Sequence, residues 1–392
     1  MTQDALVDPG AQDEELQRAI RTAMDKVCEG QRLPLGSQVL ELEVRFARDV
    51  QCQYAIGVSS GSDALLLALM ALDIGPGDEV ITSAFAPAAA AVAIARTGAR
   101  PIFCDIDPET YNLSAAEVDE FIDEHCEAQG RGRGLLVNRR TGGRIKALLP
   151  VHLFGQLCEM GEFMELARHL RLRVIEDVQH ATGAHDTSYV AAGSFGDVGC
   201  FSFAPTNILG AYGDAGMCVT HDKDLAAKIK ALRTQAAAPK DHHAPSGRNF
   251  KLDEIQAAVL NVKLDFLEDW LRMRDFNAHI YWELFVSKFT RGGIVPVRPG
   301  PVGRHVFSHY VIRAQDRDRL RAHLNASDIE TELCCPTPLH LQPSFAHLGH
   351  KTGDLPQTEL AARETLSLPI YPQLTASQIE HIVTAIERFY KG

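Results

Sequence analysis

Between residues 55 and 220, short apolar runs alternate with longer segments in which apolar residues recur three and four positions apart. The runs predict strands and the longer segments predict helices. The predicted strands are 79–83, 101–105, 145–151, 172–176, 199–203 and 216–220, and the predicted helices are 62–72, 88–96 and 115–127. This alternation predicts an α/β fold in which a mainly parallel sheet is covered by helices on both faces.

The pattern changes after residue 252, where a long helical periodicity begins. The elements predicted from there on are a helix over 252–289, strands at 306–313 and 329–333, and a closing helix at 376–389. A basic, glycine-rich stretch over 130–144 predicts an exposed loop or hairpin. We therefore expect an N-terminal helical arm over 1–35, a large α/β domain over 36–255 and a small C-terminal α+β domain over 256–392.

The composition is that of a globular protein and limits its partners. The chain has 392 residues, of which 45% are hydrophobic and 23% charged, and this balance is ordinary for a protein with a substantial core. The net charge of −12 at pH 7 argues against nonspecific binding to nucleic acid or to an anionic membrane. No apolar run reaches about 18 residues, so we expect no membrane span.

The cysteines and the N-terminal residues indicate the compartment. There are nine cysteines, an odd number with irregular spacing, which predicts reduced and mostly buried thiols. No C-x-x-C pair suggests zinc, so no metal site is expected. The first residues are polar and acidic, which is not typical of a signal peptide. We therefore expect a cytoplasmic protein.

The segment Gly57-Val58-Ser59-Ser60-Gly61-Ser62-Asp63-Ala64 joins a predicted strand to the start of a predicted helix. Free backbone N–H groups, the helix dipole and small hydroxyl side chains make such a turn suitable for binding an anion. Gly61 and Ser62 are the candidates for this role. A simple capped turn without a ligand fits the same residues, and the sequence of this segment alone leaves both interpretations open.

A second candidate segment, Glu176-Asp177-Val178-Gln179-His180, ends a predicted buried strand. Ligands of parallel sheets usually lie beyond the carboxyl ends of the strands. A carboxylate placed there can pair with a protonated pyridine nitrogen of a cofactor. The alternative is structural, with Asp177 as a helix cap and His180 as a packed side chain.

Residues 200–214 read Cys-Phe-Ser-Phe-Ala-Pro-Thr-Asn-Ile-Leu-Gly-Ala-Tyr-Gly-Asp. From about Leu35 to Tyr390 the chain resembles the DegT/StrS family of sugar aminotransferases. The family's own pattern for the stretch that matches residues 202–214 is S-F-x-P-x-K-N-L-G-x-Y-G-D. The resemblance implies a fold-type I enzyme that uses pyridoxal phosphate (PLP), with a seven-stranded type of sheet. The family's Lys forms the Schiff base with the cofactor, and Asn207 stands at that position. An amide cannot form an imine or act as a base near neutral pH, so ordinary transamination is disfavoured.

The resemblance also implies roles for residues around the cofactor. It places Asp177 on the pyridine nitrogen and His180 near the ring oxygen. It places Gly61, Ser62 and Ser202 on the cofactor phosphate.

Asn249 matches an asparagine that reaches the phosphate across a dimer interface. This match implies a homodimer whose active sites are shared between subunits. The alternative is that Asn249 is only a turn residue before the long helix, and the two interpretations stay open.

Two further positions depart from the family pattern. The segment 78–88, which contains Phe85, carries Pro87 where an aromatic side chain normally stacks on the pyridine ring, and proline has no π face. Cys334 and Cys335 replace a common His-Tyr pair ahead of Pro-Thr-Pro-Leu-His340. The resemblance places Phe85, Cys334, Cys335 and His340 on the substrate side of the pocket.

We therefore expect a lysine-less member of the sugar aminotransferase superfamily. It would act on an amino or keto sugar, or a small molecule like a sugar nucleotide, in sugar or secondary-metabolite biosynthesis. PLP or pyridoxamine phosphate (PMP) would be held noncovalently, or as an external aldimine with the substrate's own amine. His180 or the thiol of Cys334 would then move protons.

Two alternatives stay open. One is a catalytically inactive partner subunit of an active aminotransferase. The other is an enzyme that no longer uses PLP and has adapted the pocket to another ligand.

Overall fold

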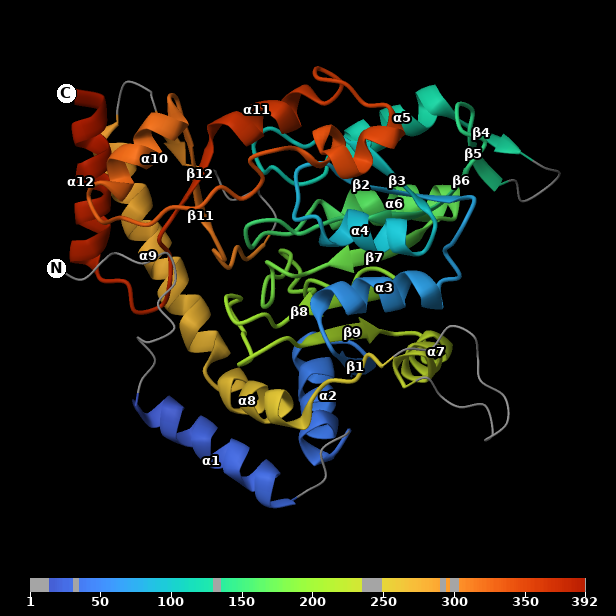
Figure 1. Cartoon of the computed structure of the whole chain (residues 1–392), viewed down its shortest axis with the longest axis horizontal. Helices are drawn as coiled ribbons and strands as arrows, with labels where there is room; N and C mark the ends of the chain where they lie inside the picture. Colours follow the sequence, from blue (N-terminus) through green and yellow to red (C-terminus); the bar gives the residue numbers. More distant parts are fainter. Residues whose placement is uncertain are drawn as a thin grey trace.

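The protein contains two β-sheets, each packed against helices (Figure 1). The structure is a computed structural model, and it describes residues 14–30, 35–129, 135–234, 249–289, 294–296 and 303–391. The larger sheet lies in the part that was predicted to be α/β, and the smaller sheet lies near the C-terminal helix.

The larger sheet is mainly parallel. Its strands are β1 (Tyr54–Val58), β2 (Asp78–Ser83), β3 (Arg100–Cys104), β4 (Cys126–Gln129), β5 (Leu135–Asn138), β6 (Arg144–Leu149), β7 (Arg173–Asp177), β8 (Val198–Ser202) and β9 (Gly216–Thr220). The main path runs β1-β9-β8-β7-β6-β2-β3, and the β4–β5 hairpin attaches through β6. Only β9 runs antiparallel to its neighbours on this path. The predicted α/β class with a mainly parallel sheet is therefore confirmed, and in the described part of the chain the sheet has nine strands in all, seven of them on the main path.

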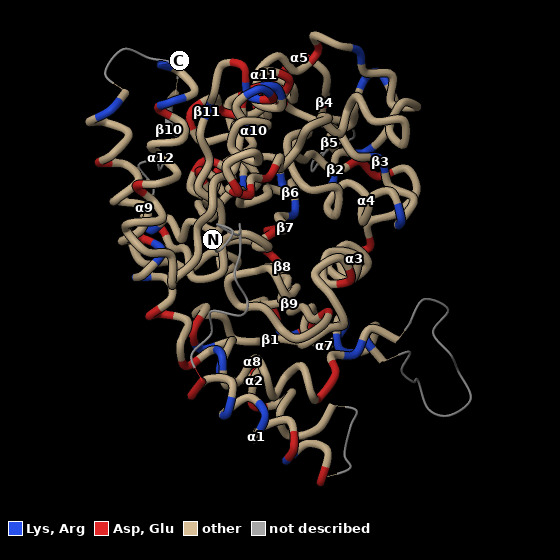
Figure 2. Tube along the Cα trace, turned by 60° about the vertical axis from the view of Figure 1, so that its left-hand side comes forward, with Lys and Arg blue, Asp and Glu red and all other residues tan. Residues whose placement is uncertain are grey.

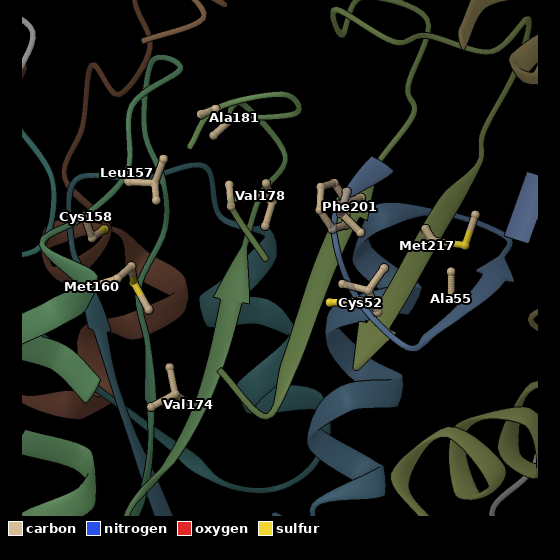
Figure 3. Packing of buried hydrophobic residues seen from close by; sticks show 14 of the residues in the cluster. Cys52, Ala55, Leu157, Cys158, Met160, Val174, Val178, Ala181, Phe201 and Met217 are labelled. Carbon is tan, nitrogen blue, oxygen red and sulfur yellow. The ribbon is translucent and has the colours of Figure 1, made fainter. Parts of the chain in front are cut away.

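Helices cover both faces of this sheet, because its strands are apolar on both sides. The helices are α2 (Ser37–Asp49), α3 (Gly61–Ala71), α4 (Ala89–Arg96), α5 (Ala115–His125), α6 (Met160–Leu170) and α7 (Lys223–Arg233). Along β8, Cys200 joins the apolar cluster with α3, whereas Phe201 joins the one with α2, as the two-residue period of a strand requires. The Phe46 ring of α2 meets the Phe201 ring edge-on, with centroids 4.9 Å apart. Figure 3 shows Phe201, Met217 and Cys52 packed in this cluster.

The smaller sheet forms a separate apolar core with the C-terminal helices. Its strands β10 (Ile294–Pro296), β11 (Tyr310–Ala314) and β12 (Thr365–Leu368) are antiparallel. The surrounding helices are α9 (Leu267–Lys288), α10 (Arg317–Asn325), α11 (Pro356–Glu364) and α12 (Ala376–Lys391). The short helices η2 (Leu339–Leu341) and η3 (Pro343–Leu348) pack instead in a cluster with residues of α4 and β3. The Tyr281 ring of α9 stacks on the Tyr310 ring of β11 with centroids 4.4 Å apart, which fixes the helix against the sheet.

Four predicted elements differ from the structure. The strand predicted over 306–313 begins only at Tyr310, as β11. The single helix over 252–289 is instead α8 (Glu254–Leu264) followed by α9, because i→i−3 hydrogen bonds at Asp265 and Phe266 tighten the chain between them. The helix over 115–127 ends at His125, since the next residues pair with β5 as strand β4. The segment 329–333 forms isolated bridges instead of a strand, and one of these joins Glu332 to Ser367.

The N-terminal arm is helical over α1 (Glu14–Gly30). Leu16 and Ile20 of α1 pack against Val259 of α8, and Trp270 of α9 borders the same cluster. Residues 1–13 and 31–34 of the predicted arm, and 130–134 of the predicted loop, lie outside the described residues. The domain boundaries at 35 and 255 stay predictions.

Three further observations concern the charged residues, the length of the helices and the cysteines. Acidic and basic residues are interspersed along the trace and do not gather into one basic face (Figure 2). Within the described ranges, no helix is both long and apolar enough to cross a membrane. Of the nine cysteines, Cys28 is exposed and Cys334 is partly buried, while the others are buried.

Candidate functional site

A pocket of about 680 Å³ lies beyond the carboxyl ends of β1, β7 and β8, facing the smaller sheet. The predicted site residues that line it are Gly61, Ser62, Pro87, His180, Ser202, Asn207 and Cys334. They come from segments far apart in the chain, and the sheet brings these segments together because parallel strands end at one edge.

One end of the pocket is the turn from β1 into α3. The Ser60 hydroxyl caps α3 by accepting from the backbone N–H of Asp63 at 3.1 Å. A Cβ atom on Gly61 would lie 2.4 Å from Cβ of Ser202, so only glycine allows the helix to start this close to the end of β8. The first turn of a helix presents free N–H groups and a positive dipole end. Together with the Ser202 hydroxyl, this end of the pocket suits a phosphate.

Asp177 ends β7 behind the residues that line the pocket. Its side chain is buried, and one oxygen accepts from the backbone N–H of Gln179 at 3.1 Å. Burial raises the pKa of Asp177 from 3.8 to about 6, although that hydrogen bond and His152 lower it. A buried carboxylate with one hydrogen bond is poorly compensated, so a cationic partner such as a pyridinium would stabilise its charged form.

The neighbouring Glu176 fixes the end of β7. Its carboxylate is fully buried and accepts from the backbone N–H groups of Gly193 at 2.8 Å and Gly196 at 2.7 Å. The backbone N–H of Cys158 donates to Nδ1 of His152, so this network assigns the proton to Nε2 of His152, which lies 3.0 Å from Glu176. With its oxygens satisfied, Glu176 holds the strand end that places Asp177.

Two histidine rings lie against each other in the pocket. The His180 and His309 centroids are 4.6 Å apart, and His180 is 8% exposed. Burial lowers the pKa of His180 to about 4, and burial together with nearby positive groups lowers the pKa of His309 well below 6.5. Both rings are therefore neutral near pH 7 and can accept a hydrogen bond. Nδ1 of His180 has no partner within the described structure.

Asn207 lies in the loop between β8 and β9, where its side-chain amide donates to the carbonyl of Ser202 at 2.8 Å. No lysine or arginine occurs among the described residues that line the pocket. Lys263 of α8 approaches the same loop from outside the pocket lining, and it donates to the carbonyl of Gly210 at 2.6 Å. Burial lowers the pKa of Lys263 to about 8, and its contact with Gly210 supports the loop.

Besides Asp177, four predicted residues lie outside this pocket lining. Phe85 and Cys335 belong to an apolar cluster behind Cys334. The Sγ atoms of Cys334 and Cys335 are 3.8 Å apart. His340 is buried, with Nε2 3.3 Å from the Glu359 carboxylate.

Asn249 is exposed, and its backbone pairs with Thr234. The structure thus brings the predicted phosphate residues together with His180 and Asn207. The roles assigned to Phe85, Cys335, His340 and Asn249 stay predictions.

The lining residues that were not identified from the sequence include Glu330, Glu332 and His309. The first two alternate with buried or half-buried neighbours in the segment predicted as a strand at 329–333. The two-residue period, continued to Cys334, was the signal that could have found them. His309 carried no such signal, because the fold alone brings its ring to His180.

The sheet order and the placement of this pocket define a fold-type I α/β protein of the PLP-dependent aminotransferase kind. The chain belongs to the DegT/DnrJ/EryC1/StrS aminotransferase family, whose pattern matches residues 14–387. The match covers both sheets and every lining residue of the pocket.

Individual relatives cover the whole chain. A "pleiotropic regulatory protein" of Geobacillus stearothermophilus is 41% identical over 98% of both chains. A UDP-N-acetyl-3-dehydro-alpha-D-glucosamine 3-aminotransferase of Acidithiobacillus ferrooxidans is 37% identical over 100% of both. The solved structure of S. venezuelae DesV in complex with a ketimine intermediate has a TM-score of 0.90 and 34% identity, and the match covers 100% of each chain.

Proposed function

We propose that this protein is a lysine-less member of its family that binds PLP or PMP without a covalent link. It would act on an amino or keto sugar, or on a small molecule like a sugar nucleotide. The observation that carries the proposal is Asn207 in a pocket whose described lining has no lysine. The cofactor, when bound, would supply an electron sink for bond changes next to its nitrogen.

The residues present suit the cofactor at both ends. Gly61, Ser62 and Ser202 would hold the phosphate. Because Gly61 has no Cβ, the Ser202 side chain can lie directly against the start of α3. Asp177 would pair with the pyridine nitrogen, and its raised pKa supports this role because a cation there relieves the cost of its burial. The unpartnered Nδ1 of His180 supports a hydrogen bond to the ring.

His180 is the better of the two proton carriers considered. Burial lowers the pKa of His180 to about 4, so its imidazole is neutral near pH 7 and has a ring nitrogen available as an acceptor, although the same shift makes it a weak base. The neighbouring Cys335 and burial raise the pKa of Cys334 well above 9.0, so that thiol keeps its proton. We therefore assign proton acceptance to His180, and the contact with the substrate to Cys334. Asn207 would orient the ligand by hydrogen bonding.

A homodimer with shared sites forms part of the proposal. Asn249 is exposed on its own subunit, directly before a residue whose carbonyl accepts from the Ser59 N–H at 3.0 Å. It thus lies close in space to the phosphate turn, while its exposed side chain can meet a second subunit. An exposed asparagine in this place supports a contribution across the interface.

A second candidate function is a partner subunit that completes the site of an active aminotransferase. Asn207 favours it too, because a chain without the lysine could still lend Asn249 to a neighbour. Co-expression with a lysine-containing paralogue separates the candidates. A mixed dimer with changed activity supports the partner function, and purified protein that turns over alone supports the enzyme.

Titration of the purified protein with PMP, followed by the cofactor's absorption bands, tests the proposal. We expect saturable binding that is lost on dialysis. An absorption spectrum of the cofactor that stays unchanged at millimolar PMP and PLP would refute the proposed function.

A further inference from the structure

Pro87 and the adjacent pair Cys334 and Cys335, which depart from the family pattern, meet beside the pocket. Pro87 and Cys334 line the pocket and also a second hollow of about 370 Å³, and Cys335 lines that hollow with them. Pro336 and Thr337 in the same lining are exposed, so the hollow lies at the protein surface. Cys334 therefore lies between the pocket and a surface hollow.

The two thiols lie against each other. The Sγ atoms of Cys334 and Cys335 are 3.8 Å apart. Consecutive side chains of an extended strand point to opposite faces, and the bend of the chain at Cys334 brings these two to the same side. Cys335 is 7% exposed within its apolar cluster, whereas Cys334 is only partly buried. A reagent in either cavity therefore meets Cys334 first.

Backbone hydrogen bonds on both sides of the pair hold this arrangement. Ahead of it, Glu332 exchanges hydrogen bonds with Ser367 of β12, at 3.2 and 2.9 Å. After it, the N–H of Leu339 donates at 2.9 Å to the carbonyl of Ala84, directly beyond the end of β2. Because the segment is fixed to both sheets, the two thiols are positioned to react with each other before any reagent arrives.

We propose that Cys334 and Cys335 form a redox modification site, at which a low-molecular-weight disulfide reversibly oxidises the two thiols to a vicinal disulfide. This inference goes beyond the proposed function and does not depend on a bound cofactor. The Cys334 thiolate attacks one sulfur of the reagent, whose S–S bond breaks, and the half that leaves takes up the proton that Cys334 lost.

The mixed disulfide on Cys334 is then resolved by its neighbour. Cys335 attacks the Sγ atom of Cys334, and the second half of the reagent leaves with the proton of Cys335. Two protein thiols are thereby oxidised, and one reagent disulfide is reduced to two thiols.

The geometry of adjacent residues makes this disulfide reversible. The peptide between Cys334 and Cys335 is trans, which places their Cα atoms about 3.8 Å apart, closer than the roughly 4.4–6.8 Å usual for disulfides. The bond is therefore strained and readily reduced, as regulatory disulfides are. Its closure draws the Cys334 sulfur toward Cys335 and changes the wall of the pocket.

Treatment of the full-length protein with 2-hydroxyethyl disulfide, followed by alkylation of the remaining thiols and peptide mass spectrometry, tests the inference. The neighbouring Cys335 and burial raise the pKa of Cys334 well above 9.0, so the reaction is run at about pH 8.5 to increase the thiolate fraction. The test variants are Cys334→Ser and Cys335→Ala. The matched control is Cys28→Ser, which removes the exposed thiol of α1.

In the wild type and in Cys28→Ser, we expect the peptide that contains both cysteines to lose two hydrogen atoms, and dithiothreitol to restore both thiols. Cys335→Ala should stop at the mixed disulfide on Cys334 and accumulate at least about tenfold more of it than the wild type. Cys334→Ser should form neither product. If Cys335→Ala does not fold, the wild-type peptide alone decides the result.

Three results would overturn the inference. The first is that both cysteines of the wild type are still alkylated after treatment. The second is a mixed disulfide on Cys334 that persists in the wild type. The third is a disulfide that joins either cysteine to a different one, or a vicinal disulfide that dithiothreitol does not reduce.

Discussion

At the residue scale, the buried Asp177 links stability to cofactor binding. Because burial raises its pKa from 3.8 to about 6, the folded protein binds more protons at this group than the unfolded chain between those two pH values. The contribution of Asp177 to the free energy of unfolding therefore falls as pH rises through this window. Above about pH 6 the charged carboxylate costs about 3 kcal/mol, which a bound pyridinium would recover.

Replacement Asp177→Asn should consequently stabilise the cofactor-free protein at pH 7 and weaken PMP binding about tenfold or more, the order of one lost charged contact. Chemical denaturation and PMP titration measure the two effects. The stabilisation should vanish below about pH 4, where the wild-type carboxyl is protonated in both states. A variant that is less stable at pH 7 yet binds PMP normally would show that Asp177 is structural.

Replacement Asn207→Lys should return the missing amine to the pocket. Its amide now donates to the Ser202 carbonyl at the pocket wall, so a longer amine at this position would extend into the cavity. We expect PLP to become covalently attached at position 207, detected by mass spectrometry of peptides after borohydride reduction. The wild type is the control. If both proteins carry the PLP label on a lysine other than residue 207, the assignment of residue 207 is wrong.

The residues that the sequence revealed are those whose chemistry is set locally. Gly61, Ser202 and Asn207 lie in contiguous segments with a characteristic order, and the structure gathers them into one pocket. His309 and Glu332 could not be placed in this way. Their meeting with His180 depends on how the smaller sheet packs on the larger one, which no local pattern encodes.

At the scale of elements, the start of α3 lies directly against the end of β8. Gly61→Ala should push these elements apart, because its Cβ would meet Ser202 at 2.4 Å. We expect a loss of about 1–3 kcal/mol in stability and a loss of PMP affinity, measured by denaturation and titration.

Gly161→Ala is the matched control, since nothing lies within 4 Å of a Cβ placed there and the residue lies in the first turn of α6. It should be neutral or slightly stabilising. If both variants behave alike, the close approach at Gly61 carries no special role.

The hydrophobic pattern predicted the positions of strands well where both faces of the strand are buried under helices. The predicted strand 216–220 coincides with β9, and 79–83 differs from β2 by one residue. The long helix failed because its periodicity continues across Asp265 and Phe266, where only a change of hydrogen bonding ends α8. The helical period depends on which side chains are apolar, and the partly buried Phe266 and Leu267 continue the apolar pattern through that bend.

At the scale of the whole molecule, the exposed apolar side chains of α2 favour self-association. Leu40 and Val44 lie one turn apart and are 58% and 73% exposed, and such adjacent apolar groups are typical of interfaces. We expect a dimer at micromolar concentration in sedimentation experiments, and Val44→Asp should shift it toward monomer. Glu120→Gln should leave the dimer intact, and a monomeric wild type would contradict shared active sites.

The central claim is that this pocket holds a pyridoxal-type cofactor without a covalent anchor. A crystal structure of the protein with saturating PLP tests it most directly. The account predicts the phosphate at Gly61, Ser62 and Ser202, the pyridine nitrogen against Asp177, and no bond between the cofactor and residue 207. A pocket that stays empty, or PLP joined covalently to a lysine of the protein, would contradict it.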